Sequence, residues 1–407
     1  MDLQLPTPSD SDIDRYTAIV NRVMRIEDIT SGGAKQDYVA RYRGRITGDT
    51  AAAYDQLAAQ FRPLGVTVLF RPDGAEDDPA ARHSVYLVPG VNNPAPANPW
   101  INLLMFVLTF ATVVYTGATT HNVYASPVGL GQTVLGGLPF ALGLLAILLA
   151  HEFGHYLVGR YYNVQLTLPY FIPFPSFIGT LGAVINMQEV PKNRRTLMDI
   201  GIAGPLSGLA VAVPLLFVGL SISNVGLVDT SGLQPGYSYS MEGNSLFYLG
   251  AKLLIFGKLL PAPASYGEAG PLLYWVRYFF TGRPFPEGGL DVLIHPLAFA
   301  GWIGLLVTAM NLLPVGQLDG GHLVYVLIGR RARKLWPVVM VLLLALGFVS
   351  PSWWLWAALI FFLGRRYAEP LDTITPIGPR RKLLAVLGLL IFFLVFIPVP
   401  LIIITAP

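Results

Sequence analysis

Apolar and polar positions divide the chain into two parts. Residues 1–95 mix charged residues with short patterned segments, whereas the remainder holds several apolar runs of nearly twenty residues. A helix needs about 20 apolar residues to cross a bilayer. The pattern therefore predicts an α-helical polytopic membrane protein with about 7 spans, preceded by a small N-terminal α+β soluble domain.

The N-terminal domain, residues 1–95, is expected to contain two helices and three strands. Apolar residues three and four apart predict an amphipathic helix over 14–29. A second helix is predicted over 50–61, with Asp49 or Thr50 as its cap. Strands are predicted over 38–46, 65–71 and 83–89. Such a domain could regulate, dimerise or present substrate, and a merely shielding role is an equal alternative.

The apolar part is predicted to hold an intramembrane core, residues 96–334, and a C-terminal three-span extension, residues 335–407. Spans of the core are expected at about 100–119, 138–160, 196–221 and 293–328, and those of the extension at 335–349, 353–363 and 383–404. A polar, glycine-rich loop is expected over 121–137. Segments 245–260 and 271–281 are short for spans and predict interfacial or partly inserted helices.

The segment between the second and third spans, residues 163–190, does not have the pattern of a helix. Pro169, Pro173 and Pro175 interrupt an apolar stretch, and Gly179-Thr-Leu-Gly-Ala183 follows. Prolines at this density prevent a continuous helix. We expect a re-entrant β-hairpin loop whose edge could pair with an extended peptide. A plain interfacial loop is the alternative.

Composition and charge agree with a membrane protein. Of 407 residues, 53% are hydrophobic and 13% are charged, against about 25% charged in soluble domains. The chain has no cysteine, which excludes disulfides and thiolate metal sites. With the N-terminus in the cytoplasm, basic residues of the short loops fall on the cytoplasmic side. This predicts a multi-pass protein of a bacterial cell membrane, with its catalytic opening on that side.

Within the apolar run 138–160 stands His151-Glu-Phe-Gly-His155. Two histidines four residues apart share one face of a helix, so both can reach one tetrahedral zinc ion. Glu152 lies beside the first ligand, where it can take a proton from a metal-bound water. Such residues in a membrane helix are costly and usually functional. The alternative is a helix whose polar residues bind neighbouring helices.

A second polar group follows in Asn311-Leu-Leu-Pro-Val-Gly-Gln-Leu-Asp-Gly-Gly-His322. Pro314 and Gly316 predict a break in the helix. Asp319 is then placed near the break at membrane depth, and a third zinc ligand is the simplest explanation. A structural aspartate that caps the resumed helix is the alternative. His322 is expected to pack or to support the site rather than to bind the metal.

These residues resemble the site-2 protease family of intramembrane zinc metalloproteases over residues 140–330. The lack of an evident PDZ insertion, together with the α+β domain before the first span, resembles the plastid and cyanobacterial branch. The resemblance implies one Zn2+ per chain, bound by His151, His155 and Asp319, with Glu152 as the catalytic base. It also implies that Asn311 contacts substrate or the oxyanion. It further implies that a hairpin containing Gly179, Thr180, Leu181 and Gly182 clamps substrate as an added strand.

The expected function is hydrolysis of peptide bonds within or near transmembrane segments, with single-span membrane proteins as substrates. The lipid bilayer is an expected partner, whereas nucleic acid and cofactors beyond zinc are not expected. Three alternatives are weighed. A related enzyme acting on prenylated or soluble peptides would need a glutamate as third ligand. A transporter or metal channel would need several ligands along a path for the ion. An inactive scaffold would not need Glu152.

Overall fold

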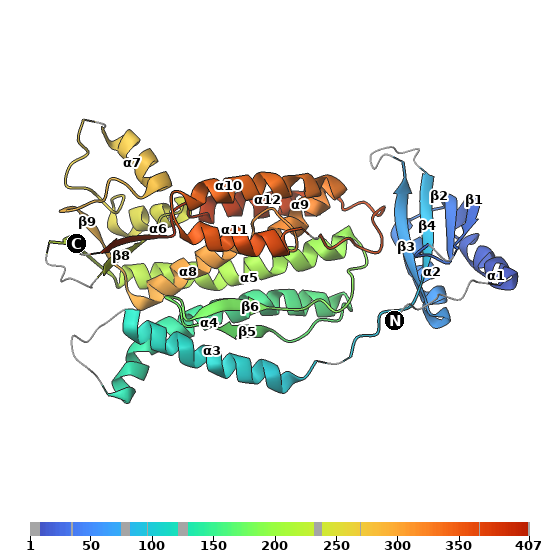
Figure 1. The fold of residues 1–407 in the computed structure, drawn as a ribbon, viewed down its shortest axis with the longest axis horizontal. Helices are drawn as coiled ribbons and strands as arrows, with labels where there is room; N and C mark the ends of the chain where they lie inside the picture. Colours follow the sequence, from blue (N-terminus) through green and yellow to red (C-terminus); the bar gives the residue numbers. More distant parts are fainter. Residues whose placement is uncertain are drawn as a thin grey trace. The chain divides into compact units, whose positions relative to one another are not determined.

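The computed structural model describes residues 9–33, 36–74, 82–95, 97–120, 129–231, 238–268, 270–365 and 367–405. These form two compact units (Figure 1). The first comprises Met1–Pro96 together with Met187–Leu197 and Ala368–Arg381, and the second comprises the remaining segments. Two segments that are remote in sequence are thus part of the N-terminal unit.

The first unit is built on a four-stranded antiparallel sheet with the order β1-β2-β4-β3. Its elements are α1 (Asp10–Val20), β1 (Met24–Ser31), β2 (Ala40–Ile46), α2 (Thr50–Phe61), the 3-10 helix η1 (Arg62–Leu64), β3 (Val66–Asp73) and β4 (Arg82–Pro89). Leu57 and Phe61 of α2 are buried with Tyr42, Phe70 and Val85 of the strands. The side chain of Asp49 accepts a hydrogen bond from Ala52 N, so the predicted cap and helix over 50–61 are confirmed.

The predicted helix over 14–29 is wrong in its second half. The helix ends at Val20, and Met24–Ser31 pairs with β2 instead. The apolar spacing also suits alternate burial on a strand, and the ladder of hydrogen bonds to β2 decides between the two. The N-terminal domain therefore has four strands among its described residues, one more than expected.

The second unit contains three helices that are long and apolar enough to cross a membrane. They are α3 (Pro99–Thr120), α4 (Leu130–Tyr161) and α5 (Arg194–Ser221). α4 begins before the predicted span, so residues 130–137 of the predicted loop are helical, and 121–128 lie outside the described residues. A Cβ on Gly137 would lie 2.0 Å from Val114 O, so the glycine permits α3 and α4 to pack closely along this extra turn.

The other helices of the second unit are shorter. They are α6 (Leu246–Phe256), α7 (Gly270–Thr281), α8 (Pro296–Asn311), α9 (Asp319–Ile328), the 3-10 helix η2 (Gly329–Lys334), α10 (Leu335–Gly347), α11 (Ser352–Leu363) and α12 (Pro379–Val395). About seven spans are therefore not confirmed, because three described helices meet the length and composition of a span. The last predicted span, 383–404, is wrong beyond Val395, since residues 401–405 form a strand after Pro398 and Pro400.

Three strand pairs complete the second unit. They are β5 (Tyr170–Pro173) with β6 (Thr180–Val184), β7 (Asn224–Leu227) with β9 (Leu290–Leu293), and β8 (Ser238–Glu242) with β10 (Leu401–Thr405). The β5–β6 pair is the predicted hairpin, and it runs along α3 and α4 (Figure 1). The fold thus brings a hairpin next to the helix that carries both histidines of the His-Glu-x-x-His set.

Candidate metal centre

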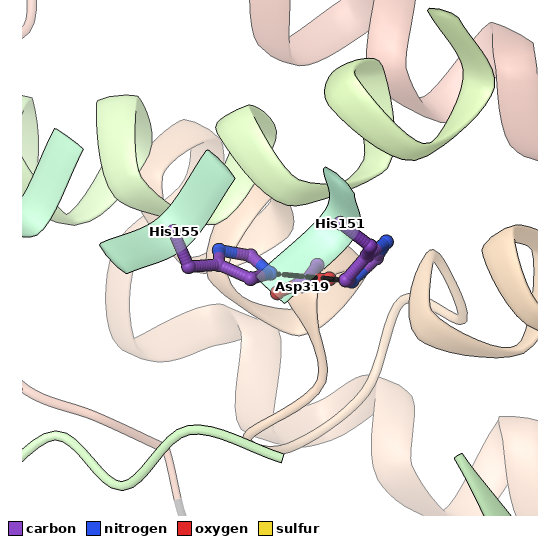
Figure 2. A group of neighbouring side chains, drawn as sticks. All are labelled: His151, His155 and Asp319. Carbon is purple, nitrogen blue, oxygen red and sulfur yellow. Dashed lines mark hydrogen bonds and ion pairs between the residues drawn. The ribbon is translucent and has the colours of Figure 1, made fainter. Parts of the chain in front are cut away.

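His151 and His155 point from α4 toward Asp319, the first residue of α9 (Figure 2). Asp319 Oδ2 lies 3.4 Å from Nε2 of each histidine, and the two Nε2 atoms lie 3.3 Å apart. Tetrahedral zinc with bonds of about 2.0–2.1 Å places its ligand atoms about 3.3 Å apart. The three donor atoms therefore have the spacing of one face of a zinc tetrahedron, which leaves a fourth position open.

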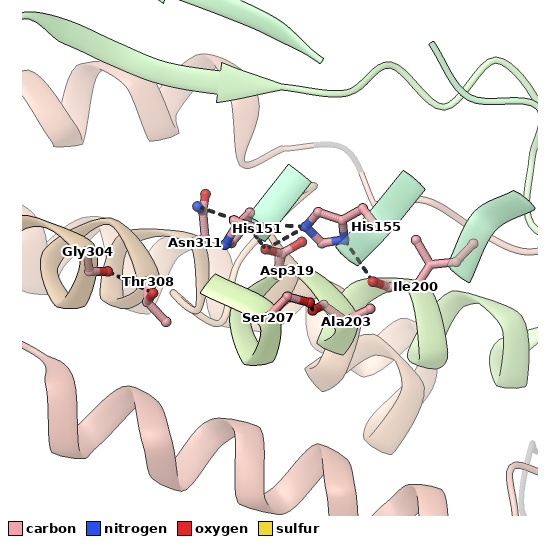
Figure 3. Close-up of polar contacts among 9 residues, drawn as sticks. All are labelled: His151, His155, Ile200, Ala203, Ser207, Gly304, Thr308, Asn311 and Asp319. Carbon is pink, nitrogen blue, oxygen red and sulfur yellow. Dashed lines mark hydrogen bonds and ion pairs between the residues drawn. The ribbon is translucent and has the colours of Figure 1, made fainter. Parts of the chain in front are cut away.

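The histidine rings are oriented by contacts on their other sides. The carbonyl oxygen of Ile200, on α5, lies 2.8 Å from His155 Nδ1 (Figure 3). A carbonyl can only accept, so the hydrogen is assigned to Nδ1, and Nε2 keeps its lone pair for a metal. Near His151, the Nδ2 atom of Asn311 lies 3.4 Å from Nε2. The donor set and its orientation fit a bound zinc ion.

Glycines on α5 permit this arrangement. A Cβ on Gly204 would lie 2.0 Å from His155 Nε2, and one on Gly208 would lie 3.2 Å from His151 Nδ1. The facing helix also has a glycine at this contact, because a Cβ on Gly154 of α4 would lie 2.6 Å from Ala203 O. The small residues over 201–208 indicate close helix packing in the sequence. That Gly204 and Gly208 face His155 and His151 follows only from the structure.

Asp319 reaches the histidines because the chain breaks between α8 and α9. Gly316 has φ +61°, in the region that favours glycine. A Cβ on Gly320 would lie 1.9 Å from Leu312 O, so the turn is tightly folded. The N-cap of α9 is Leu318, without a side-chain cap. The Asp319 carboxylate faces the histidines, and the alternative in which it caps the helix has no support in this geometry.

The remaining predicted site residues lie around this group. Glu152 follows His151 on α4 and is buried, with 5% of its surface exposed. Asn311 is the last residue of α8. His322 lies one turn after Asp319, where its Cβ lies 3.2 Å from the position that a Cβ on Gly201 would occupy. It lies outside the three-residue group of possible metal ligands, in keeping with a packing role.

The hairpin residues are held by α3 rather than by the metal group. Gly179 has φ +83°, and its carbonyl oxygen accepts from Thr112 Oγ1 at 2.7 Å. Thr180 Oγ1 donates to Ile172 O at 2.8 Å across the hairpin, and Gly182 N donates to Thr180 Oγ1. Leu181 is 54% exposed. In the described part of the chain β6 pairs with β5 alone, so its other edge has no strand beside it.

The comparisons with known proteins point to one family. A model of peptidase family M50 matches residues 139–349, just over half of the chain. The protein named probable zinc metalloprotease EGY1, chloroplastic, of Arabidopsis thaliana is 29% identical over 392 residues, which cover 90% of this chain and 64% of that protein. The probable zinc metalloprotease EGY2, chloroplastic, of the same plant is 29% identical over 65% of this chain and 42% of its own length. No solved structure matched the chain.

Together the fold and the site define a class of protein in which a His-His-Asp group that could hold a metal ion is built partly on a helix long and apolar enough to cross a membrane. The chain belongs to peptidase family M50, the site-2 protease family. The predicted resemblance, including the plastid-type branch, is therefore confirmed. The chain spans less than two thirds of the length of these curated relatives.

Proposed function

We propose that this protein is an intramembrane zinc metalloprotease that hydrolyses peptide bonds within or near transmembrane segments of membrane proteins. The observation that carries the proposal is the triangle of His151 Nε2, His155 Nε2 and Asp319 Oδ2, whose sides fit one zinc ion. This triangle is built partly on α4, a helix long and apolar enough to cross a bilayer. Family membership supports the same reaction.

The chain's own residues supply the proton transfer and the orientation of the substrate. Zinc, when bound, polarises the scissile carbonyl and acidifies a water molecule. Glu152, one residue from His151, takes the proton of the attacking water and returns it to the leaving amine. We assign to Asn311 the role of donating to the oxyanion, and its Nδ2 atom, 3.4 Å from His151 Nε2, supports this role. The substrate must be extended for attack, because a helix hides its carbonyls in its own hydrogen bonds.

The hairpin gives the extended substrate a place to bind. The outer edge of β6 presents backbone donors and acceptors without a neighbouring strand among the described residues. An extended peptide can add to such an edge. We therefore assign Gly179, Thr180, Leu181 and Gly182 to substrate binding. Single-span membrane proteins in the lipid bilayer are the proposed substrates.

Three domains and a membrane location complete the proposal. We retain residues 1–95, 96–334 and 335–407 as the soluble domain, the protease core and the C-terminal extension. The apolar helices support a membrane protein. The curated relatives are chloroplastic, so the bacterial cell membrane, with the N-terminus and the catalytic opening in the cytoplasm, stays a prediction.

The test compares wild type with Glu152→Gln on a panel of single-span substrates in liposomes, with bound zinc measured in both. We expect cleavage by wild type alone and equal zinc contents. Glu268→Gln is the matched control, because Glu268 is exposed and lies outside the metal group. Cleavage by Glu152→Gln at the wild-type rate would refute the role of the base. A wild type that binds no zinc would favour the transporter or scaffold alternatives.

A further inference from the structure

The outer edge of β3 in the N-terminal sheet is occupied by another part of the chain. Phe70 N donates to Leu371 O at 3.0 Å, and Thr373 N donates to Phe70 O at 3.2 Å. Residues 371–373 thus pair in parallel with β3, although they lie about three hundred residues later, in the connection between α11 and α12. The sheet is longer than its four regular strands.

A second remote segment continues the sheet. Leu371 N donates to Pro191 O at 3.1 Å, and Asp372 N donates to Lys192 O at 2.7 Å. Asn193 also forms a parallel bridge with Asp372. We call residues 371–373 and 191–193 the sheet extension. It joins the N-terminal sheet to the two connections that lead into α12 and α5.

Side chains hold this extension in place. Asp372 is fully buried, and its Oδ1 accepts from Ile374 N at 2.9 Å and from Thr375 N at 3.1 Å. Arg71 Nη1 donates to Leu371 O at 2.7 Å. The hydroxyl oxygens of Thr50, on α2, and Thr375 lie 3.0 Å apart. Buried polar groups with specific partners indicate a defined interface rather than a loose contact.

Residues 187–190 connect the hairpin to residues 191–193 of the extension. Thr167 N donates to Asn186 O, and Asn186 N donates to Thr167 Oγ1, both at 3.1 Å, so the base of the hairpin is closed just before residue 187. The connector from 187 to 193 then enters the N-terminal unit. There Gln188 Nε2 donates to Ala95 O at 3.3 Å. The exit of the hairpin is thereby tied to the N-terminal domain.

Residue 193 of the extension directly precedes α5. Asn193 Oδ1 accepts from Thr196 N at 3.0 Å, which caps the start of α5. Ile200, within the second turn of α5, supplies the carbonyl that orients His155. The residue that joins the sheet is therefore seven positions from the residue that orients a metal ligand.

We propose that the N-terminal domain is a positioning domain for proteolysis. Through the sheet extension it holds the exit of the β5–β6 hairpin and the start of α5, and so keeps the substrate edge of β6 in position. This inference rests on the proposed function, because it assigns substrate binding to β6. It gives the N-terminal domain a role in positioning, which a merely shielding domain would not have.

The first arm of the test removes the hydrogen bonds from Thr373 to Phe70 O in the full-length protein. Thr373→Pro deletes both the N–H and the hydroxyl that donate to Phe70 O, whereas Thr373→Val keeps the N–H and deletes only the hydroxyl. Amide exchange is measured by mass spectrometry over 182–200. We expect exchange in 187–193 and in the first turn of α5 to rise about tenfold in Thr373→Pro, as for the loss of one backbone hydrogen bond, and to rise much less in Thr373→Val.

Cleavage of a single-span substrate is measured with the same proteins. The domain acts on binding at the hairpin, so Thr373→Pro should raise KM severalfold while the zinc content stays at the wild-type value.

The second arm of the test joins α2 to residue 375 by a disulfide. Thr50→Cys with Thr375→Cys places two thiols where the hydroxyls lie 3.0 Å apart, in a chain without other cysteines. Oxidation of this pair in the Thr373→Pro background should restore both the exchange protection and KM.

Two results would overturn the inference. One is exchange over 187–200 that is the same in Thr373→Pro as in wild type. The other is an oxidised Thr50→Cys/Thr375→Cys protein that loses cleavage until a reductant is added, since the docked domain would then inhibit. If wild type cleaves no substrate, the proposed function fails instead, and the exchange measurements still decide whether the domain holds the connector.

Discussion

The close approach of Gly204 to His155 makes a sharp prediction about zinc binding. In Gly204→Ala the new methyl carbon would lie 2.0 Å from His155 Nε2, the atom proposed to bind zinc, whereas ordinary contacts begin at 3.4 Å. Either the imidazole or α5 must move by about 1.4 Å to restore contact. Metal ligands tolerate deviations of only about 0.2 Å. Movement of α5 instead would break the 2.8 Å hydrogen bond from His155 to Ile200 O.

We therefore expect Gly204→Ala to weaken zinc binding by at least about 100-fold, the upper end of the loss caused by removing a supporting hydrogen bond alone. Competition with a chromophoric chelator measures the affinity in detergent. Gly208→Ala should weaken zinc binding less than Gly204→Ala. Its Cβ would lie 3.2 Å from His151 Nδ1, and a small shift of the side chain removes this close contact. Gly250→Ala, with nothing within 4 Å on α6, is the control and should bind zinc as wild type does.

Equal zinc affinities for Gly204→Ala and Gly250→Ala would refute the placement of His155 against α5. Unfolding of Gly204→Ala would be a separate outcome, so thermal unfolding is measured in excess chelator. There the metal contributes nothing, and the variant should lose only the about 1–3 kcal/mol typical of an overpacked site. An unfolding temperature that is lowered only modestly without metal, combined with weak zinc binding, is the expected pair of results.

Three further predictions follow from the described contacts. Asp319→Ala should reduce zinc to a small fraction of one per chain by metal analysis, and a full zinc content would remove Asp319 from the ligand set. Asn311→Ala should keep its zinc but lower kcat by about 10²–10³, as for an oxyanion donor, and an unchanged kcat would exclude that role. Burial and the nearby Asp291 carboxylate raise the pKa of Glu242, on β8, from 4.5 to about 7. The folded protein therefore holds a proton that the unfolded chain has lost between these values, so the free energy of unfolding should fall as pH rises from 4.5 to 7 and then level off. Glu242→Gln should flatten this profile, and an unchanged slope would contradict the assignment.

The three residues of the candidate metal centre could be predicted to lie together because their signals are local. His151 and His155 need only one helix to share a face, and the predicted helix over 138–160 is present within α4. Asp319 needed one further step, the break predicted at Pro314 and Gly316, which the structure confirms between Asn311 and Asp319. Both inferences use backbone rules that act over a few residues, so they do not depend on whether other elements are predicted correctly.

Features that depend on remote partners could not be predicted. Met24–Ser31 has the spacing of a helix, and only its ladder with β2 makes it a strand. Leu401–Thr405 continues an apolar run, yet it pairs with β8. No pattern in residues 191–193 or 371–373 indicates that they meet each other and β3. In each case hydrogen bonds between distant segments decide the structure, and these bonds cannot be predicted from local propensity.

The residues of the candidate metal centre and the residues that position them lie on different helices. His151 and His155 lie on α4, and Asp319 lies on α9. Their geometry depends on α5, whose glycines face the histidines and whose Ile200 carbonyl orients His155. The start of α5 is capped by Asn193, which also bridges to Asp372 in the sheet extension. We infer that a perturbation of the N-terminal unit is transmitted through Asn193 into the start of α5. In this proposal the N-terminal unit acts through the connections that lead into α5 and α12, because residues 187–197 and 368–381 are part of it.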